Sequence, residues 1–208
     1  NKLYGKHLFK GDISAPYLER HGLNRDTLST SDWTKNGETA DRVAAAVLDW
    51  ARDNGASVYC HWFQPLGANS VRHGNSAQVQ MRMFKFDRNG NLEWDFSGND
   101  LLYGETDGSS YPNGGLRATH RAGGYLIIDP TSPIFLRGDT IFIPSCFITY
   151  NGHALDEKTP LLRSVDAMSQ QGVRLLKLLG YEVKSLACNI GLEQEFFFVP
   201  RAAYLKRP

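Results

Sequence analysis

Hydrophobic and polar positions follow two different periods along this chain, and each period predicts a different kind of element. Residues 39–55 carry apolar side chains at helical spacing, so we expect a helix with Thr39 as its N-cap and Gly55 at its end. A β-branched and aromatic run follows at Val58–Phe63 and predicts a central strand. The apolar positions of the predicted helix are Ala40, Val43, Ala44, Val47, Leu48 and Ala51.

A β-hairpin is expected next along the chain. Val79–Phe86 and Leu92–Phe96 flank an Asn89-Gly90 pair. That pair is a strong hairpin signal, because both residue types adopt the left-handed backbone angles of a tight turn. In the second of these strands apolar residues alternate with acidic ones, as a half-buried strand requires.

Further strands are expected at 125–128, 134–136 and 140–150, where short apolar runs are separated by turn residues. Gly104–Gly115 is rich in glycine, serine and proline and predicts a long loop. The first three-quarters of the chain is therefore expected to form a sheet-rich domain with one obvious helix, in the α+β class.

A second domain is expected from residue 155 onward, which divides the chain into 1–154 and 155–208. Thr159-Pro160 is a typical helix start, and Gly180 is well placed to end that helix. The apolar and aromatic run at 185–199 then predicts a strand. The predicted helix presents one face that contains Leu162, Val165, Gly172, Leu176 and Leu179.

Two glutamates inside that last predicted strand are the first candidates for chemistry. Side chains alternate faces along a strand, so Glu193 and Glu195 would lie on one side, roughly 6.5–7 Å apart. Two carboxylates in apolar surroundings repel one another and are costly to desolvate, and a bound Mg²⁺ or Mn²⁺ removes both costs. The alternative from spacing alone is a sheet face open to water with two solvated glutamates.

Composition narrows the classes of partner. The formal net charge is +1, and lysine and arginine are scattered, so neither a nucleic acid nor a membrane surface is an expected partner. No apolar run approaches the roughly 18–20 residues that span a bilayer. Three widely spaced cysteines favour buried thiols in a reducing compartment over a disulfide framework. We therefore expect a cytoplasmic protein, or one in an organelle if a leader was removed.

Four motifs, in order along the chain, resemble those of glutamine synthetases, in the form found in the type III branch. The segment 104–119 resembles the Asp-Gly-Ser-Ser loop of that family, and Gly191–Phe198 resembles its metal-binding strand. His61–Leu66 and Ala154–Ser164 are likewise similar to type III sequences. The resemblance extends, with interruptions, from about Tyr4 to Pro208.

The resemblance implies a fold, a reaction and a set of site residues. The N-terminal domain would be β-grasp-like, and residues from 155 would supply the first helix and strand of an α/β catalytic domain. The family uses ATP to phosphorylate the side chain of glutamate, and ammonia then displaces phosphate from γ-glutamyl phosphate to give glutamine. Glu193 and Glu195 match metal ligands, Asp107 matches the residue that binds ammonium and takes its proton, and Ser110 matches a serine that supports that site.

The resemblance also implies an assembly. Family members form homo-oligomeric double rings, here expected to be a dodecamer, with each active site between neighbouring subunits. The remaining metal ligands, the ATP site and the glutamate site would lie beyond Pro208, so these residues alone are not expected to be active. Two interpretations remain open. The chain is part of a longer glutamine synthetase polypeptide, or it is a short non-catalytic paralogue that acts as a structural or regulatory subunit.

Overall fold

The computed structural model describes residues 5–62, 80–105, 124–149, 151–154, 156, 158–191, 193, 196 and 198–205. The chain separates into two compact units, Asn1–Leu162 and Arg163–Pro208. The domain boundary expected between 154 and 155 stays a prediction.

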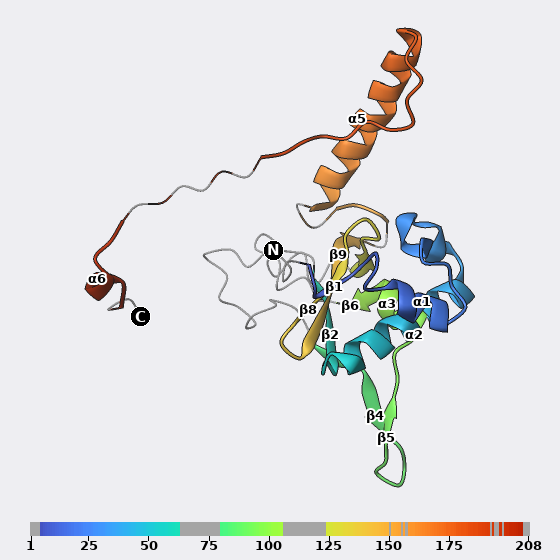
Figure 1. Cartoon of the computed structure of the whole chain (residues 1–208), viewed down its shortest axis with the longest axis vertical. Coiled ribbons are helices and arrows are strands. Elements are labelled where there is room, and N and C mark those ends of the chain that lie inside the picture. The colour runs from blue at the N-terminus through green and yellow to red at the C-terminus, as the bar shows by residue number, and fades with distance from the viewer. Residues whose placement is uncertain are drawn as a thin grey trace. The chain divides into compact units, whose positions relative to one another are not determined.

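A mixed seven-stranded sheet forms the frame of the first unit (Figure 1). Its hydrogen-bonded order is β1-β8-β9-β2-β3, and β7 pairs with both β9 and β6. β9 is the longest strand: Thr140–Pro144 pair in parallel with β2, and Ser145–Thr149 pair with β7 in the antiparallel sense. The strands are β1 (Leu8–Phe9), β2 (Val58–Trp62), β3 (Met81–Arg82), β6 (Tyr103–Glu105), β7 (Gly124–Ile128), β8 (Ile134–Arg137) and β9 (Thr140–Thr149).

The main helix of the first unit is α2 (Gly37–Asp53), which confirms the helical period of the sequence. Its buried face joins one apolar cluster with side chains of β2, β7, β8 and β9. The N-cap was wrongly predicted. The cap is Asn36, whose side chain accepts a hydrogen bond from the Thr39 amide at 3.0 Å, so Thr39 is in the first turn.

The end of α2 follows the sequence prediction closely. Gly55 has a φ of +76°, which glycine adopts without a steric cost. The Gly55 amide donates to the carbonyl of Arg52, and the Ala56 amide donates to that of Ala51. This pair of bonds is a Schellman motif and gives two otherwise unpaired carbonyls a donor.

The predicted hairpin is present as β4 (Phe84–Phe86) and β5 (Leu92–Trp94), in antiparallel register. The first strand of the hairpin was predicted as one continuous element, but its described part is divided at Met83 into β3 and β4. β3 pairs with β2 in the main sheet, and the chain then leaves that sheet for the separate hairpin. Met83 is fully buried at the division, its amide donates to the carbonyl of Ser57, and its carbonyl accepts from the amide of Asp95.

Several short elements lack a sequence signal strong enough to predict them. They are too short to show a hydrophobic period, and most of them pack against α2. Gly104, expected in a loop, instead lies within β6. These elements are α1 (Ala15–Arg20), the 3₁₀ helices η1 (Thr27–Ser29) and η2 (Asp32–Lys35), and α3 (Gly98–Leu102).

A buried ion pair ties the turn after β7 to the start of α5 (Lys158–Leu178). The Lys158 ammonium lies 2.6 Å from a carboxylate oxygen of Asp129, which is 3% exposed. Burial raises the pKa of Asp129, but hydrogen bonds from Lys158, Thr131 and Ser132 outweigh burial and hold that pKa below its usual value.

The helix that the Thr159-Pro160 signal predicts is therefore confirmed, with a different first turn. The Asp156 carboxylate accepts from the Thr159 amide at 3.0 Å, so Asp156 performs the capping role expected of Thr159. At the other end, Gly180 has a φ of +87° and its amide donates to Lys177, which confirms the expected stop.

The second unit holds most of α5, the segment that follows it, and α6 (Arg201–Leu205). No described residue of 185–199 is in a strand, so the described part of this segment does not form the strand expected there. A strand needs a hydrogen-bonded neighbour, and no described strand pairs with it. Large apolar side chains are exposed in this unit, namely Met168, Leu175, Leu178, Leu179, Tyr181, Ile190, Phe196, Phe198 and Val199.

Two further expectations bear on location. Within the described ranges, no helix combines the length and apolar character needed to cross a bilayer. Of the three cysteines, only Cys60 is buried. Cys146 is half-buried and Cys188 is exposed, so the expectation of three buried thiols was wrong.

Candidate functional site

The four site residues predicted from the sequence fall in two places along the chain. The structure describes only one of these four residues. Asp107 and Ser110 lie in 106–123, and Glu195 lies in the C-terminal unit; all three are outside the described residues. Glu193 is described. The structure therefore neither brings the four residues together nor separates them, and their roles stay predictions.

The strands on either side of 106–123 are described, and they pair with each other. Tyr103 faces Ile127, Gly104 faces Leu126, and Glu105 faces Tyr125 in an antiparallel ladder. β7 is in turn paired with β9 along its full length. The two ends of the segment that carries Asp107 therefore leave the sheet from adjacent strands, and Asp107 is only two residues beyond the last residue of β6.

A buried histidine packs directly beneath β6. His61, in β2, is 5% exposed, and its ring lies so close to Gly104 that a Cβ at that position would be 2.6 Å from His61 Cδ2. Only glycine fits there without displacing the ring. His61 is therefore packed in the core, and the close approach of its ring explains why position 104 is a glycine.

The His61 ring is fixed by a hydrogen bond at each nitrogen. Nδ1 lies 2.9 Å from Ser145 Oγ in β9, and Nε2 lies 2.8 Å from the carbonyl oxygen of Asp100 in α3. Burial lowers the pKa of His61, although the hydrogen bond and the negative charge of Asp100 act in the opposite direction. Neutral imidazole therefore donates from Nε2 and keeps Nδ1 as an acceptor.

The short helix α3 leads straight into β6 and is itself tightly held. Ser97 and Asp100 form a reciprocal capping box, in which the Ser97 hydroxyl accepts from the Asp100 amide and the Asp100 carboxylate accepts from the Ser97 amide. The Gly98 amide donates to the Asp41 carboxylate of α2 at 2.7 Å. Burial, followed by the charge of Asp100, raises the pKa of Tyr59 to about 12, so its hydroxyl stays protonated beside that carboxylate.

We call the assembly of α3, β6, β7, His61 and Ser145 the β6 frame. Every connection in it is a backbone ladder, a capped helix or a buried hydrogen bond, so the position of Glu105 is strongly determined. Sequence reasoning found the glycine-rich loop but missed the frame. The Ser97-x-x-Asp100 capping pattern just before that loop could have indicated the helix α3, but not the contacts of His61 and Ser145.

Glu193 has quite different surroundings. It is exposed, lies outside any helix or strand, and has no ion-pair partner among the residues that the structure describes. The segment before it packs back against α5. Leu186 contacts Gly172, and the Leu186 amide donates to the Ser169 hydroxyl at 3.1 Å.

No group of three potential metal-ligating side chains occurs in the described parts of the chain. The Glu193 carboxylate is nevertheless of the type that Mg²⁺ and Mn²⁺ prefer, and no described lysine or arginine pairs with it. The donor chemistry of this residue therefore fits the predicted metal, and a second ligand would come from Glu195.

Comparison with known proteins gives one consistent result. The family model described as "Glutamine synthetase type III N terminal" matches residues 1–164. The chain is 38% identical to the type-3 glutamine synthetase of Dictyostelium discoideum over 209 aligned residues, which cover 91% of this chain and 28% of that protein. It is 35% identical over 212 aligned residues to a glutamine synthetase of Bacteroides fragilis (strain YCH46), which covers all of this chain and 28% of that protein.

A third relative, a glutamine synthetase of Butyrivibrio fibrisolvens, is 40% identical over 74 residues, which cover 35% of this chain and 10% of that protein. The chain thus spans a little over a quarter of the length of the first two relatives that it matches. The similarity covers the segments that carry Asp107 and Ser110 as well as the C-terminal unit in the Bacteroides alignment.

Proposed function

Because this chain belongs to the glutamine synthetase type III family, we propose that it acts, as part of a longer polypeptide, in the ATP-dependent ligation of ammonia to glutamate. The observation that carries the proposal is the alignment with the Bacteroides protein named glutamine synthetase. It covers 100% of this chain and so includes every residue proposed for the site.

We assign roles according to what each side chain can do chemically. Asp107 would attract ammonium and take its proton, because ammonium must lose a proton before its nitrogen can attack an acyl phosphate. Ser110 would support that position through its hydroxyl. The β6 frame would hold the start of this segment in place, because it fixes Glu105 two residues before Asp107.

Glu193 and Glu195 would hold Mg²⁺ or Mn²⁺. When bound, the cation neutralises charge on the phosphate oxygens of ATP, which is the main requirement of phosphoryl transfer. The two glutamates would supply the anionic oxygens that keep it in position. Glu193 is exposed, so its carboxylate is open to a ligand.

We further propose that the functional protein is a homo-oligomeric ring, a dodecamer, with glutamate, ammonium and ATP meeting at a site between subunits. Size-exclusion chromatography with light scattering on the full-length polypeptide tests this directly. The proposal predicts a mass about twelve times that of one subunit, and a monomer at working concentration would contradict it.

The first test of the activity is glutamine formation by the full-length polypeptide that contains these residues. We expect glutamine to form only when glutamate, ammonium, ATP and Mg²⁺ or Mn²⁺ are all present. A well-folded protein that forms none under any of these conditions would contradict the enzyme and favour a non-catalytic structural or regulatory subunit.

A substitution of Asp107 tests the role of that residue. We expect Asp107→Asn to raise the ammonium concentration needed for half-maximal rate and to lower the rate by roughly 10²-fold or more, because a positioned base contributes that much. ATP binding, followed with a fluorescent analogue, should change little. An equal loss of ATP binding would mean that this residue supports the structure rather than the proton transfer.

A further inference from the structure

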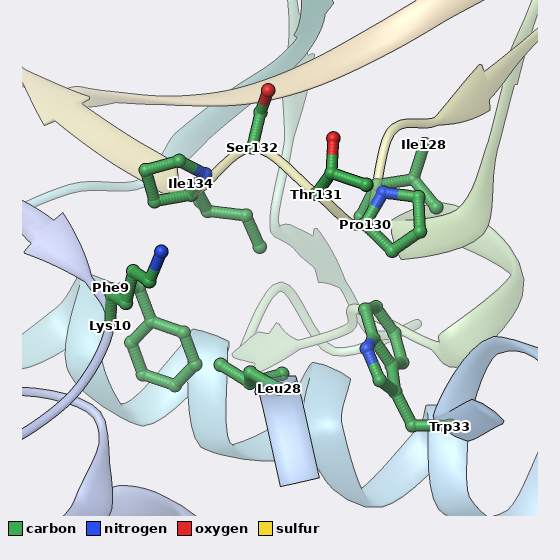
Figure 2. Close-up of a pocket in the computed structure, with 10 residues that line it drawn as sticks. Phe9, Lys10, Leu28, Trp33, Ile128, Pro130, Thr131, Ser132 and Ile134 are labelled. Carbon is green, nitrogen blue, oxygen red and sulfur yellow. The ribbon is translucent and has the colours of Figure 1, made fainter. Parts of the chain in front are cut away.

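A small pocket opens at one side of the first unit, and its lining includes none of the residues assigned above. It lies between the end of β1, the two 3₁₀ helices η1 and η2, and the turn that joins β7 to β8, and its volume is about 40 Å³ (Figure 2). Most of its wall is carbon. The apolar lining residues are Phe9, Leu28, Ile128, Pro130, Pro133 and Ile134.

One hydrogen-bond donor faces this apolar space. Trp33, in η2, is 5% exposed, and its indole Nε1 is buried with no hydrogen-bond partner among the described residues. Figure 2 shows the indole at the wall of the pocket with its nitrogen on the side of the cavity. A buried N–H group without an acceptor is unfavourable, so this donor favours any molecule that brings an acceptor into the pocket.

The other polar groups of the lining are engaged elsewhere or lie at the edge. The hydroxyls of Thr131 and Ser132 donate to the Asp129 carboxylate, and Figure 2 shows both oxygens directed away from the cavity. Lys10 is exposed and lies beside Phe9 at the edge of the pocket. The interior therefore offers a single donor in otherwise apolar surroundings.

We propose that this pocket is a binding site for a small neutral molecule with a compact apolar body and one acceptor oxygen, such as a short ketone, alcohol or amide. The acceptor oxygen receives the hydrogen bond of Trp33 Nε1, and the apolar body contacts the two prolines, Leu28 and Phe9.

The size and charge of this ligand follow from the pocket. One water needs roughly 10–15 Å³ of such volume, so about 40 Å³ admits only a few non-hydrogen atoms. A carboxylate is disfavoured inside, because the one unpartnered donor there, the Trp33 indole N–H, is neutral and a buried charge without a charged partner is costly. The site is independent of the proposed ligase activity, since it uses none of its residues.

Tryptophan indole resonances provide a direct test. The chain contains four tryptophans, Trp33, Trp50, Trp62 and Trp94, so selective ¹⁵N labelling of the indoles gives four N–H signals, three of which are internal controls. On titration of the full chain with acetone, we expect the Trp33 signal alone to move, with saturation in the millimolar range. Sodium acetate at the same concentrations should move it several-fold less.

Two matched substitutions separate binding in the pocket from a general solvent effect. Leu28→Phe fills the pocket and should abolish the acetone response, whereas Leu23→Phe makes the same change at a half-buried position outside the lining and should preserve it. The wild-type titration decides the matter even if a variant does not fold.

Three results would overturn the proposal. If the four signals move together without saturation, acetone acts as a solvent. If the Trp33 signal does not move, acetone does not bind, and only water accepts the hydrogen bond of the indole N–H. If acetate moves it as far as acetone does, the site is not selective for neutral ligands.

Discussion

The β6 frame, which precedes the segment of Asp107, and the segment that carries Glu193 are built in opposite ways, although both carboxylates were expected to serve one active site. In the frame, β6 is paired with β7, α3 is capped, and His61 is hydrogen-bonded at both ring nitrogens. In the segment 183–200 no described residue is in a strand, and Ile190 is 73% exposed. An apolar sequence pattern indicates burial against something, but hydrogen-bonded neighbours are what make a strand.

The largest expected difference between the two regions is the cost of removing an aliphatic side chain. Leu101 in α3 is fully buried, so Leu101→Ala should lower the free energy of unfolding by about 2–5 kcal/mol. Ile190→Ala in the segment should change it by less than about 0.5 kcal/mol. Urea denaturation followed by circular dichroism measures both. Equal effects would mean that the two regions are buried to the same extent.

A smaller difference is expected from one added methyl group at a glycine. Gly104→Ala would place its Cβ 2.6 Å from the His61 ring, which cannot swing away because both nitrogens are bonded, so a loss of about 1–3 kcal/mol is expected. Gly191→Ala is the matched control, since no described atom lies within 4 Å of the added Cβ. The comparison fails if Gly104→Ala is as stable as wild type.

The smallest expected effect is a pH dependence that belongs to the frame alone. Burial lowers the pKa of His61 in the folded state, so the unfolded chain binds a proton first as the pH falls below about 6.5. Stability should therefore decrease with falling pH, by at most about 1.4 kcal/mol per pH unit, until the folded pKa is reached.

His61→Gln should remove this part of the pH dependence, because glutamine does not titrate. The buried carboxylate of Asp129 does not interfere, because its lowered pKa makes its contribution disappear only below about pH 4. Denaturation midpoints of wild type and variant at pH 7 and pH 5.5 give the comparison. An identical pH dependence in the two proteins would show that His61 is not the group responsible.

The elements that could be predicted from the sequence are those that depend on a local pattern of residue types. The apolar stripe of α2, the stop at Gly55 and the turn between β4 and β5 each depend on neighbours a few residues away. The division of the chain at Met83 could not be predicted in this way, because it depends on Ser57 and Asp95, which lie in other elements.

The candidate site shows the same limit more clearly. The spacing of Glu193 and Glu195 predicted two carboxylates on one face of a strand. That prediction required a neighbouring strand in a sheet, and no described strand pairs with this segment. For the Asp107 segment, the frame below it depends on contacts between residues 61, 104 and 145, which no local pattern records. Family similarity supplied the chemistry that the local patterns could not.

The most direct test of the account is the metal dependence of glutamine formation by the full-length polypeptide, compared between wild type, Glu193→Ala and Glu182→Ala. Glu182 is an exposed glutamate of the same unit outside the motif, so its variant controls for lost charge. We expect Glu193→Ala to lose most activity and to require far more Mg²⁺ or Mn²⁺ for what remains, while Glu182→Ala behaves as wild type. Unchanged activity and metal titration in Glu193→Ala would contradict the account.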